Sequence, residues 1–144
     1  MSVDENKRIV RRINDELISQ GTMSVADELF ADHFVDHSAL PGFPPGRDGV
    51  KQLFTLFHTA FADFHVTIED QVAEGDKVVT RKTFHGTHRG DFMGIPPTGK
   101  TVSFGVIDIL RVEGGQVTDH WTVVDQLGLM QQLGVIPAPG QTGT

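Results

Sequence analysis

The chain has 144 residues, of which 38% are hydrophobic, and its 19 acidic and 12 basic side chains give a net charge of −7. This length is typical of one domain that buries roughly two thirds of its unfolded surface. The basic residues form no stripe, which argues against nucleic acid as a partner. The absence of cysteine excludes disulfides and thiolate chemistry. Because the start has no apolar h-region and no apolar run approaches about 18 residues, we expect a soluble, cytoplasmic protein without a membrane partner.

The first third of the chain is predicted to be helical. Apolar residues at helical spacing indicate a helix from about residue 4 to residue 20, ended by Gly21. Ser24 is expected to cap a second, short helix that includes Phe30. These two helices would form one layer of the fold.

A turn-rich passage separates these helices from a third one. Residues 33–37 predict a short extended piece, and the prolines and glycines of residues 41–49 predict a rim or lid loop. From Gly49 onward an apolar stripe that reaches Phe61 indicates the third helix.

The remainder predicts four antiparallel strands. Two β-type runs cover residues 65–72 and 77–88, and two more within residues 100–124 are joined by a turn at residues 113–115. Helices followed by strands indicate an α+β fold with the helices on one face of a bent sheet. We expect a single domain over residues 1–135 and a flexible tail over residues 136–144.

Asp108 is the residue that the pattern singles out most clearly. It shares one pleated face with alternating apolar residues, namely Val102, Phe104, Val106, Leu110 and Val112. A carboxylate in such a place is a functional candidate, although it could also pair with Arg111 or cap a bulge. Desolvation predicts a raised pKa and a neutral Asp108 that donates a hydrogen bond. On that basis Asp108→Asn should keep or raise stability at neutral pH.

The opposite face of the same hairpin is also partly apolar. Ile107, Ile109, Trp121 and Val123 fall on it and would form an exposed patch on the convex side of a bent sheet. We therefore predict a homodimer, or a dimer of dimers, that covers this face.

Seven histidines raise the question of a metal site. The pairs His33/His37 and His85/His88 have helical spacing, but both lie in segments predicted to be extended or turn. The sequence contains no HExxH, CxxC, GxSxG or nucleotide-binding glycine motif. We expect no metal and no cofactor, which leaves acid–base chemistry by carboxylates and imidazoles.

Three further candidates have a structural alternative. Asp36 could be a catalytic carboxylate or a turn residue. His120, beside Trp121, could contact a ligand or be a satisfied core histidine. Asp125 could contact a ligand or be the N-cap of the last helical turn, and the cap is the favoured interpretation.

Several segments together resemble one family. They are ELFADHFVDH, GTHRGDFMGIPPTGK, FGVIDILRVEGGQVTDHW and DQLGLMQQLG. This pattern resembles the SnoaL-like group of small polyketide cyclases over roughly residues 5–135. The resemblance implies a cone-shaped α+β barrel, as in nuclear transport factor two, scytalone dehydratase and ketosteroid isomerase. It also implies a deep apolar pocket, dimers or higher oligomers, and no cofactor.

The acidic residues of the chain differ from those of the characterised cyclases. The resemblance matches His120 to a histidine of the cyclases, but Thr122 stands where they have a general acid–base aspartate. Asp108 and Asp36 stand where the cyclases have histidine and asparagine. Ketosteroid isomerase has aspartates at both of these positions, one as the proton-shuttling base and one as a protonated donor. Its oxyanion tyrosine matches Asn14 here.

We therefore predict a cofactor-independent enzyme that acts on a hydrophobic small molecule. Its expected reaction is an intramolecular aldol cyclisation of a carbonyl or ester substrate, with Asp36 as the base and Asp108 or His120 as the donor to the enolate oxygen. Alternatives are an isomerase similar to ketosteroid isomerase and a non-catalytic module that binds lipophilic ligands. The predicted substrate-binding residues are Asn14, Phe34, His37, His88, Phe104, Trp121, Thr122 and Asp125.

Overall fold

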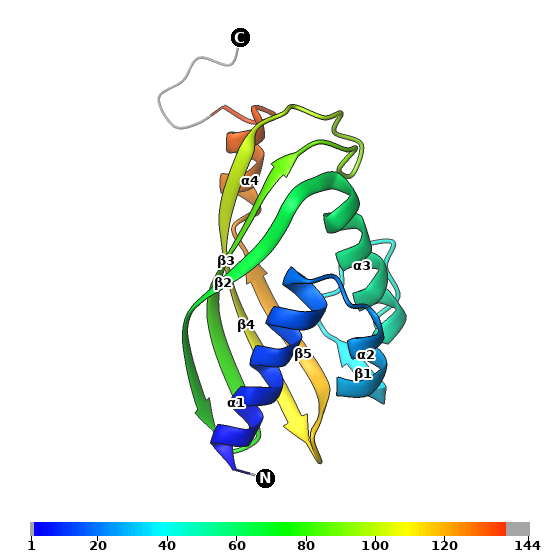
Figure 1. Cartoon of the computed structure of the whole chain (residues 1–144), viewed down its shortest axis with the longest axis vertical. Helices are drawn as coiled ribbons and strands as arrows, with labels where there is room; N and C mark the ends of the chain where they lie inside the picture. The colour runs from blue at the N-terminus through cyan, green and yellow to red at the C-terminus, as the bar shows by residue number, and fades with distance from the viewer. Residues whose placement is uncertain (1, 138–144) are drawn as a thin grey trace.

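The computed structural model describes residues 2–137, and its N-terminal helix has two parts (Figure 1). In α1 (Val3–Arg12) the Ser2 hydroxyl accepts a hydrogen bond from the Glu5 N–H at 3.1 Å, which caps the first turn. The chain continues directly into a π-helix, η1 (Ile13–Ser19). The predicted helix over residues 4–20 is therefore confirmed, and its second half is wider than an α-helix.

The next two elements differ from the prediction at their ends. α2 (Ser24–Leu29) has Met23 as its N-cap without a side-chain hydrogen bond, so the predicted Ser24 cap is wrong. Phe30 is not helical, because its backbone is extended and pairs with Val117 as the start of β1 (Phe30–Asp36). This strand confirms the predicted extended piece.

The third helix, α3 (Arg47–Ala60), also ends earlier than its apolar stripe. Phe61 has φ −122° and ψ 123° and pairs with His88, so it begins a strand rather than ending a helix. The burial of Phe61, which is 1% exposed, does not distinguish a helix from a strand. A buried apolar residue fits either element. The remaining elements are β2 (Phe61–Glu74), β3 (Lys77–His88), β4 (Thr101–Glu113), β5 (Gln116–Val124) and α4 (Gln126–Leu133).

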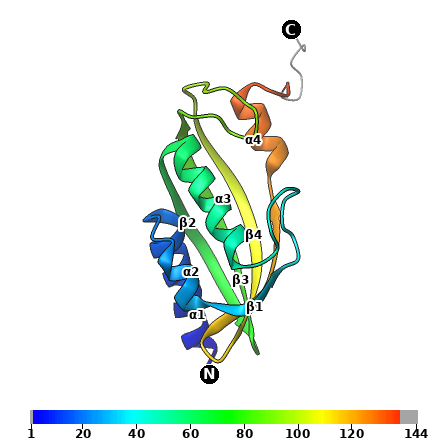
Figure 2. The same cartoon turned by 90° about the vertical axis from the view of Figure 1, so that its right-hand side faces the viewer.

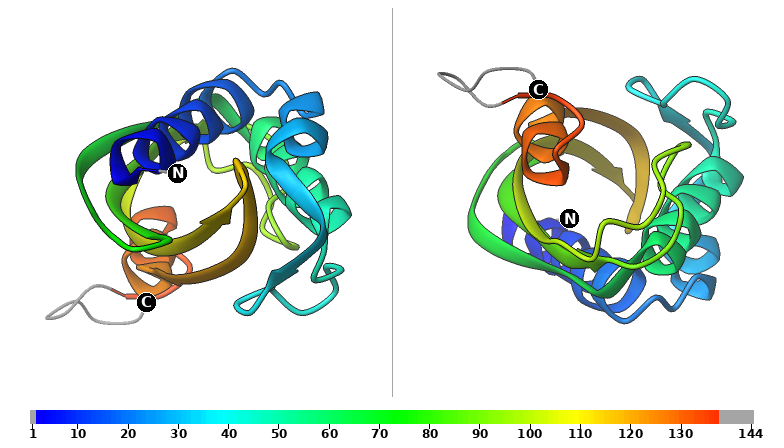
Figure 3. Two further views of the ribbon diagram at one scale, coloured as in Figure 1. Left: turned by 90° about the horizontal axis from the view of Figure 1, so that it is seen from below. Right: turned by 90° about the horizontal axis from the view of Figure 1, so that it is seen from above.

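Residues 2–137 contain one five-stranded mixed sheet with strand order β1-β5-β4-β3-β2. β1 is parallel to β5, and the other neighbours are antiparallel. The sheet is strongly bent, with α1, α2 and α3 beside its concave side and α4 at one end (Figures 2 and 3). The predicted α+β class is confirmed. The sheet stays open, because β1 and β2 are edge strands that do not pair with each other.

The core fills the space between the concave face and the helices. Alternate residues of β4 are buried from Val102 to Val112, as predicted, and Asp108 is buried with them. No helix within residues 2–137 is long and apolar enough to cross a membrane. Most of the predicted tail, residues 138–144, lies outside the described residues.

Candidate active site

Strand register brings three charged side chains together on the concave face. Asp108 in β4 lies opposite Thr80 in β3 and Thr122 in β5. Lys82 and His120 are therefore its diagonal neighbours on either side, within reach of long side chains. The contacts follow from this placement: Lys82 Nζ donates to Asp108 Oδ2 at 2.8 Å, and His120 Nε2 lies 3.6 Å from the same oxygen.

The two ends of this chain of contacts come from other elements. Asp36, at the end of β1, pairs in register with His120, and its Oδ1 lies 2.9 Å from His120 Nδ1. Asn14, in η1, accepts a hydrogen bond from Lys82 Nζ at 2.9 Å and donates to the Val10 carbonyl at 2.8 Å. We call Asn14, Lys82, Asp108, His120 and Asp36 the polar cluster.

Burial makes these contacts decisive for the charges. The side chains of Lys82 and Asp108 are each 4% exposed, and those of Asp36 and His120 are 14% and 21% exposed. Burial alone raises the pKa of Asp108, but the Lys82 ammonium and the neighbouring His120 outweigh this and place its pKa below the ordinary value. The predicted rise in the Asp108 pKa is therefore wrong, because the prediction lacked Lys82. Asp108→Asn is now expected to destabilise the fold, since it leaves a buried ammonium unpaired.

His120 and Asp36 shift in the complementary sense. Burial lowers the pKa of His120, but its contacts with Asp108 and Asp36 outweigh burial and raise it. Burial likewise raises the pKa of Asp36, whereas His120 and the Ser38 N–H lower it to a net value below the ordinary one. The cluster thus favours two carboxylates, one ammonium and one imidazolium, whose charges balance.

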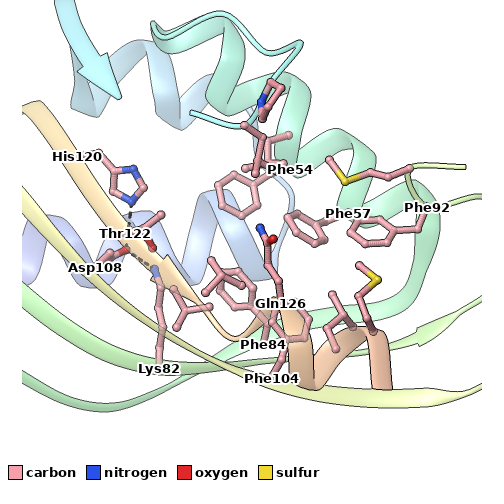
Figure 4. Close-up of a pocket in the computed structure, with 18 residues that line it drawn as sticks. Phe54, Phe57, Lys82, Phe84, Phe92, Phe104, Asp108, His120, Thr122 and Gln126 are labelled. Atoms are coloured by element: carbon pink, nitrogen blue, oxygen red, sulfur yellow. Dashed lines mark hydrogen bonds and ion pairs between the residues drawn. The ribbon is translucent and has the colours of Figure 1, made fainter. Parts of the chain in front are cut away.

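Three members of the polar cluster, Lys82, Asp108 and His120, close one end of an apolar cavity of about 250 Å³, together with Thr122 (Figure 4). The rest of the wall is mainly aromatic and aliphatic, from Leu53, Phe54, Phe57, Phe84, Phe92, Met93, Phe104, Val106, Val124, Leu129 and Met130. Asp36 does not line this cavity. It lines a smaller one of about 60 Å³ behind His120, which Phe34 also lines.

Several predicted site residues are brought together here. Asn14 belongs to the polar cluster, Phe34 lines the smaller cavity, and Phe104 and Thr122 line the larger one. The Thr122 hydroxyl donates to the Ile107 carbonyl at 3.3 Å. These residues come from four different elements, so only the tertiary structure unites them.

Other predicted site residues line neither cavity. His37 stacks on Trp121 with ring centroids 4.7 Å apart, on the other side of β5 from His120. His88 is fully buried at the end of β3, where its Nδ1 lies 3.0 Å from the Thr98 hydroxyl. Asp125 accepts a hydrogen bond from the Gly128 N–H at 2.9 Å, which confirms its interpretation as an N-cap.

Lys82 is the main residue that sequence reasoning missed. The sequence did contain a signal for this residue, because Lys82 alternates along the strand with Val78, Thr80 and Phe84, all of which are buried. A lysine on the buried face of a strand needs a buried partner. Arg111, the partner considered for Asp108, instead pairs with Asp76 at 3.0 Å. Gln126, at the start of α4, also lines the cavity and was not predicted.

No group of three or more His, Cys, Asp or Glu side chains within the described part of the chain is arranged to hold a metal ion. The ionisable groups of the cavity instead neutralise one another. Such a site can bind an apolar molecule and exchange protons with it.

A bent sheet that encloses an apolar cavity with an Asp–His–Asp contact at one end defines a small-molecule protein with acid–base groups. Residues 8–133 match the family described as SnoaL-like polyketide cyclase, and the chain belongs to this family. The predicted family is therefore confirmed.

Relatives of known name support the same assignment. The chain is 27% identical over 129 residues to the aklanonic acid methyl ester cyclase DnrD of Streptomyces peucetius, and the matched region covers 88% of each chain. It is 26% identical over 116 residues to the nogalonic acid methyl ester cyclase of Streptomyces nogalater, covering 79% of this chain and 87% of that one. Among solved structures, TsrD of Streptomyces laurentii superimposes with a TM-score of 0.86 at 29% identity, covering 94% of this chain and 99% of that one.

Proposed function

We propose that the protein catalyses a cofactor-independent intramolecular aldol cyclisation of a hydrophobic carbonyl or ester substrate. The observation that carries this proposal is His120 held between two carboxylates at the end of an apolar cavity. The names of the relatives support the same class of substrate, a polyketide methyl ester.

In the proposed reaction Asp108 and His120 act on the substrate from one side. Asp108 Oδ1 takes a proton from the nucleophilic carbon or its enol, and this carbon forms a bond to the carbonyl carbon of the same molecule. His120 Nε2 donates a proton to the oxygen of that carbonyl, which becomes a hydroxyl. The proton then passes from the carboxyl group of Asp108 to His120 Nε2, which lies 3.6 Å from Oδ2 of the same group, and the site is restored without net proton uptake.

Asp36 has a positioning role in this scheme instead of the predicted role of base. It contacts His120 Nδ1 from the side away from the larger cavity, and it fixes the orientation and charge of the ring. Asp108 also differs from its predicted role, because the adjacent Lys82 favours a carboxylate that accepts protons. A neutral, donating Asp108, as the isomerase alternative needs, is disfavoured by the same contact.

The test is ring closure of aklanonic acid methyl ester and nogalonic acid methyl ester by the purified chain, followed by chromatography. We expect turnover that His120→Asn reduces by about 100-fold or more, the usual contribution of a general acid. His37→Asn is the matched control, since His37 stacks on the other side of the sheet, and it should retain turnover. Turnover that survives His120→Asn would contradict the proposed roles.

We also propose that the enzyme is a homodimer through the convex face of the sheet. Ile107 pairs in register with Val123 on that face, and the two are 50% and 77% exposed. Ile109 and Trp121, both partly exposed, occupy the next pair on this face, where His37 also stacks on Trp121. Light scattering should give twice the chain mass, and Val123→Lys should give the single chain mass with an unchanged circular dichroism spectrum.

A further inference from the structure

The two carboxylate oxygens of Asp108 have different surroundings. Oδ2 accepts the Lys82 hydrogen bond and faces His120. Oδ1 is buried and has no hydrogen-bond partner among residues 2–137. A buried, unpaired carboxylate oxygen costs free energy, which a ligand donor would recover. Asp108 lines both cavities, and because the larger one, of about 250 Å³, has more room for a small organic molecule than the one of about 60 Å³, a ligand held there can supply that donor.

Asp108 could satisfy Oδ1 by binding a proton, but the Lys82 ammonium opposes this. This ammonium bonds Asp108 Oδ2 and Asn14 Oδ1, and the Phe84 ring lies 5.5 Å from Nζ. The ammonium is therefore surrounded by its own partners and holds the carboxylate in its charged form. A charged carboxylate has acceptors only, so the group it receives must be a hydrogen-bond donor.

The charge balance of the polar cluster selects a neutral donor over a cation. Asp36 and Asp108 are matched by Lys82 and His120, so the cavity end carries no net negative charge for a ligand cation to neutralise. Beyond this end the wall is aromatic and aliphatic, which fits a planar apolar ring system.

We propose that Asp108 Oδ1 is a subsite for a hydroxyl group, so that the substrate enters as an apolar, aromatic-type molecule with an enol or phenol O–H at its leading edge. Lys82 is the positioning residue that keeps this carboxylate oriented and charged. The inference deepens the proposed function, since an enol hydroxyl on Asp108 Oδ1 would place the nucleophile for ring closure, but it concerns binding and is testable without turnover.

The first experiment compares 2-naphthol with its methyl ether, 2-methoxynaphthalene, by calorimetric titration of the full chain. Both probes have the same ring system, but only the naphthol can donate. We expect the naphthol to bind at least about tenfold more tightly, and equal affinities would overturn the proposal. If the chain shows tenfold selectivity but closes the ring of neither polyketide ester, the hydroxyl subsite is supported and the proposed reaction is contradicted.

Variants then locate the acceptor. Asp108→Asn should reduce the ratio of the naphthol affinity to the ether affinity to about one or below. The reason is that an amide can turn its NH₂ group, a donor, toward the probe. Thr122→Val and Gln126→Leu are matched controls that each remove another side-chain oxygen acceptor of the cavity, and both should keep the wild-type ratio. Selectivity that disappears with Thr122→Val but survives Asp108→Asn would place the hydroxyl elsewhere and contradict the proposal.

The role of Lys82 has its own readout in the pH dependence of this ratio. Asp108 faces Lys82 from β3, His120 from β5 and no other charged side chain of the polar cluster directly. In the wild type the ratio should stay constant from about pH 6 to pH 8. In Lys82→Gln it should fall as the pH is lowered, because Asp108 then binds a proton, and Lys82→Arg should restore the constant ratio. A constant ratio in Lys82→Gln would overturn the positioning role.

Discussion

The concave face of the sheet has two ends of opposite chemistry on the same strands. On β3, Lys82 and Phe84 are alternate neighbours, and on β4 Phe104 and Asp108 stand on either side of Val106. Lys82, Asp108 and His120 of the polar cluster lie at one end, and phenylalanines around Phe57 lie at the other (Figure 4).

The aromatic end is stabilised by many ring–ring contacts, none of which depends on one specific partner. The Phe57 ring lies 4.9 Å from that of Phe64 and 5.6 Å from that of Phe92, and it has further ring neighbours at 6.0–6.3 Å. The polar end depends on specific partners, since each charge there has one or two. A substitution at the aromatic end should therefore act through volume, whereas one at the polar end should act through charge.

Removing the lysine should have one of the two largest effects on stability. Lys82→Met leaves Asp108 buried without its counter-charge, which costs about 3–5 kcal/mol in the free energy of unfolding. The double variant Lys82→Met/Asp108→Leu should recover most of this loss, because no unpaired charge remains. Urea unfolding measures both. Arg81→Met, on the exposed face of the same strand, is the control and should change stability little.

A cavity at the aromatic end should be comparably costly but independent of pH. Phe57 is 7% exposed, and Phe57→Ala should lower the free energy of unfolding by about 3–5 kcal/mol. Urea unfolding at several pH values should give the same loss throughout. A loss that varies with pH would contradict the distinction between the two ends.

A third carboxylate would test how much charge the polar end accepts. Thr122 pairs with Asp108, and Thr122→Asp should destabilise the fold by about 1–3 kcal/mol through a poorly paired carboxylate. Because the family resemblance implies an aspartate at this position in the characterised cyclases, the variant should also close the ring of a polyketide ester faster. Val106→Asp, one pair further along the same face, should cost stability without this gain.

The pH profile of stability should show the smallest effect, and its sign follows from the two kinds of group. Asp36 and Asp108 have lowered pKa values, so their stabilisation is present above the ordinary value of about 3.9 and is lost as the pH falls. His120 has a raised pKa, so its stabilisation is present below about 6.5 and is lost as the pH rises through the folded value.

The free energy of unfolding should therefore be highest between about pH 4 and pH 6.5. Above that window it should fall with a limiting slope of about 1.4 kcal/mol per pH unit for the one proton of His120. Denaturant unfolding across pH measures this slope. His120→Gln should remove its contribution, and an unchanged alkaline slope in that variant would assign the pH dependence to another group.

Much of this architecture could be read from periodicity. The alternation along β4 predicted a buried Asp108, and the family segments predicted the fold and the apolar pocket. Asp125 as an N-cap followed from its place before a helical turn. These features depend on neighbours in the chain or on strand parity, which the sequence records directly.

The ends of helices and strands, and the contacts between distant side chains, were harder to predict from the sequence. Phe30 and Phe61 were assigned to helices because both are apolar, whereas strand pairing decides their conformation. His88 shares its parity with Lys82 and was expected at the pocket, but it is the last residue of β3 and lines neither cavity.

The alternating pattern around Asp108 is enough to predict a carboxylate buried on one face of an α+β sheet. The charge of that carboxylate, in contrast, depends on contacts that exist only in the folded protein. The register between β3 and β4 places Lys82 diagonally from Asp108, and β5 and β1 add His120 and Asp36. Burial alone disfavours a charge, so the pKa direction depends on counter-charges that are far apart in the chain and meet only when the strands pair.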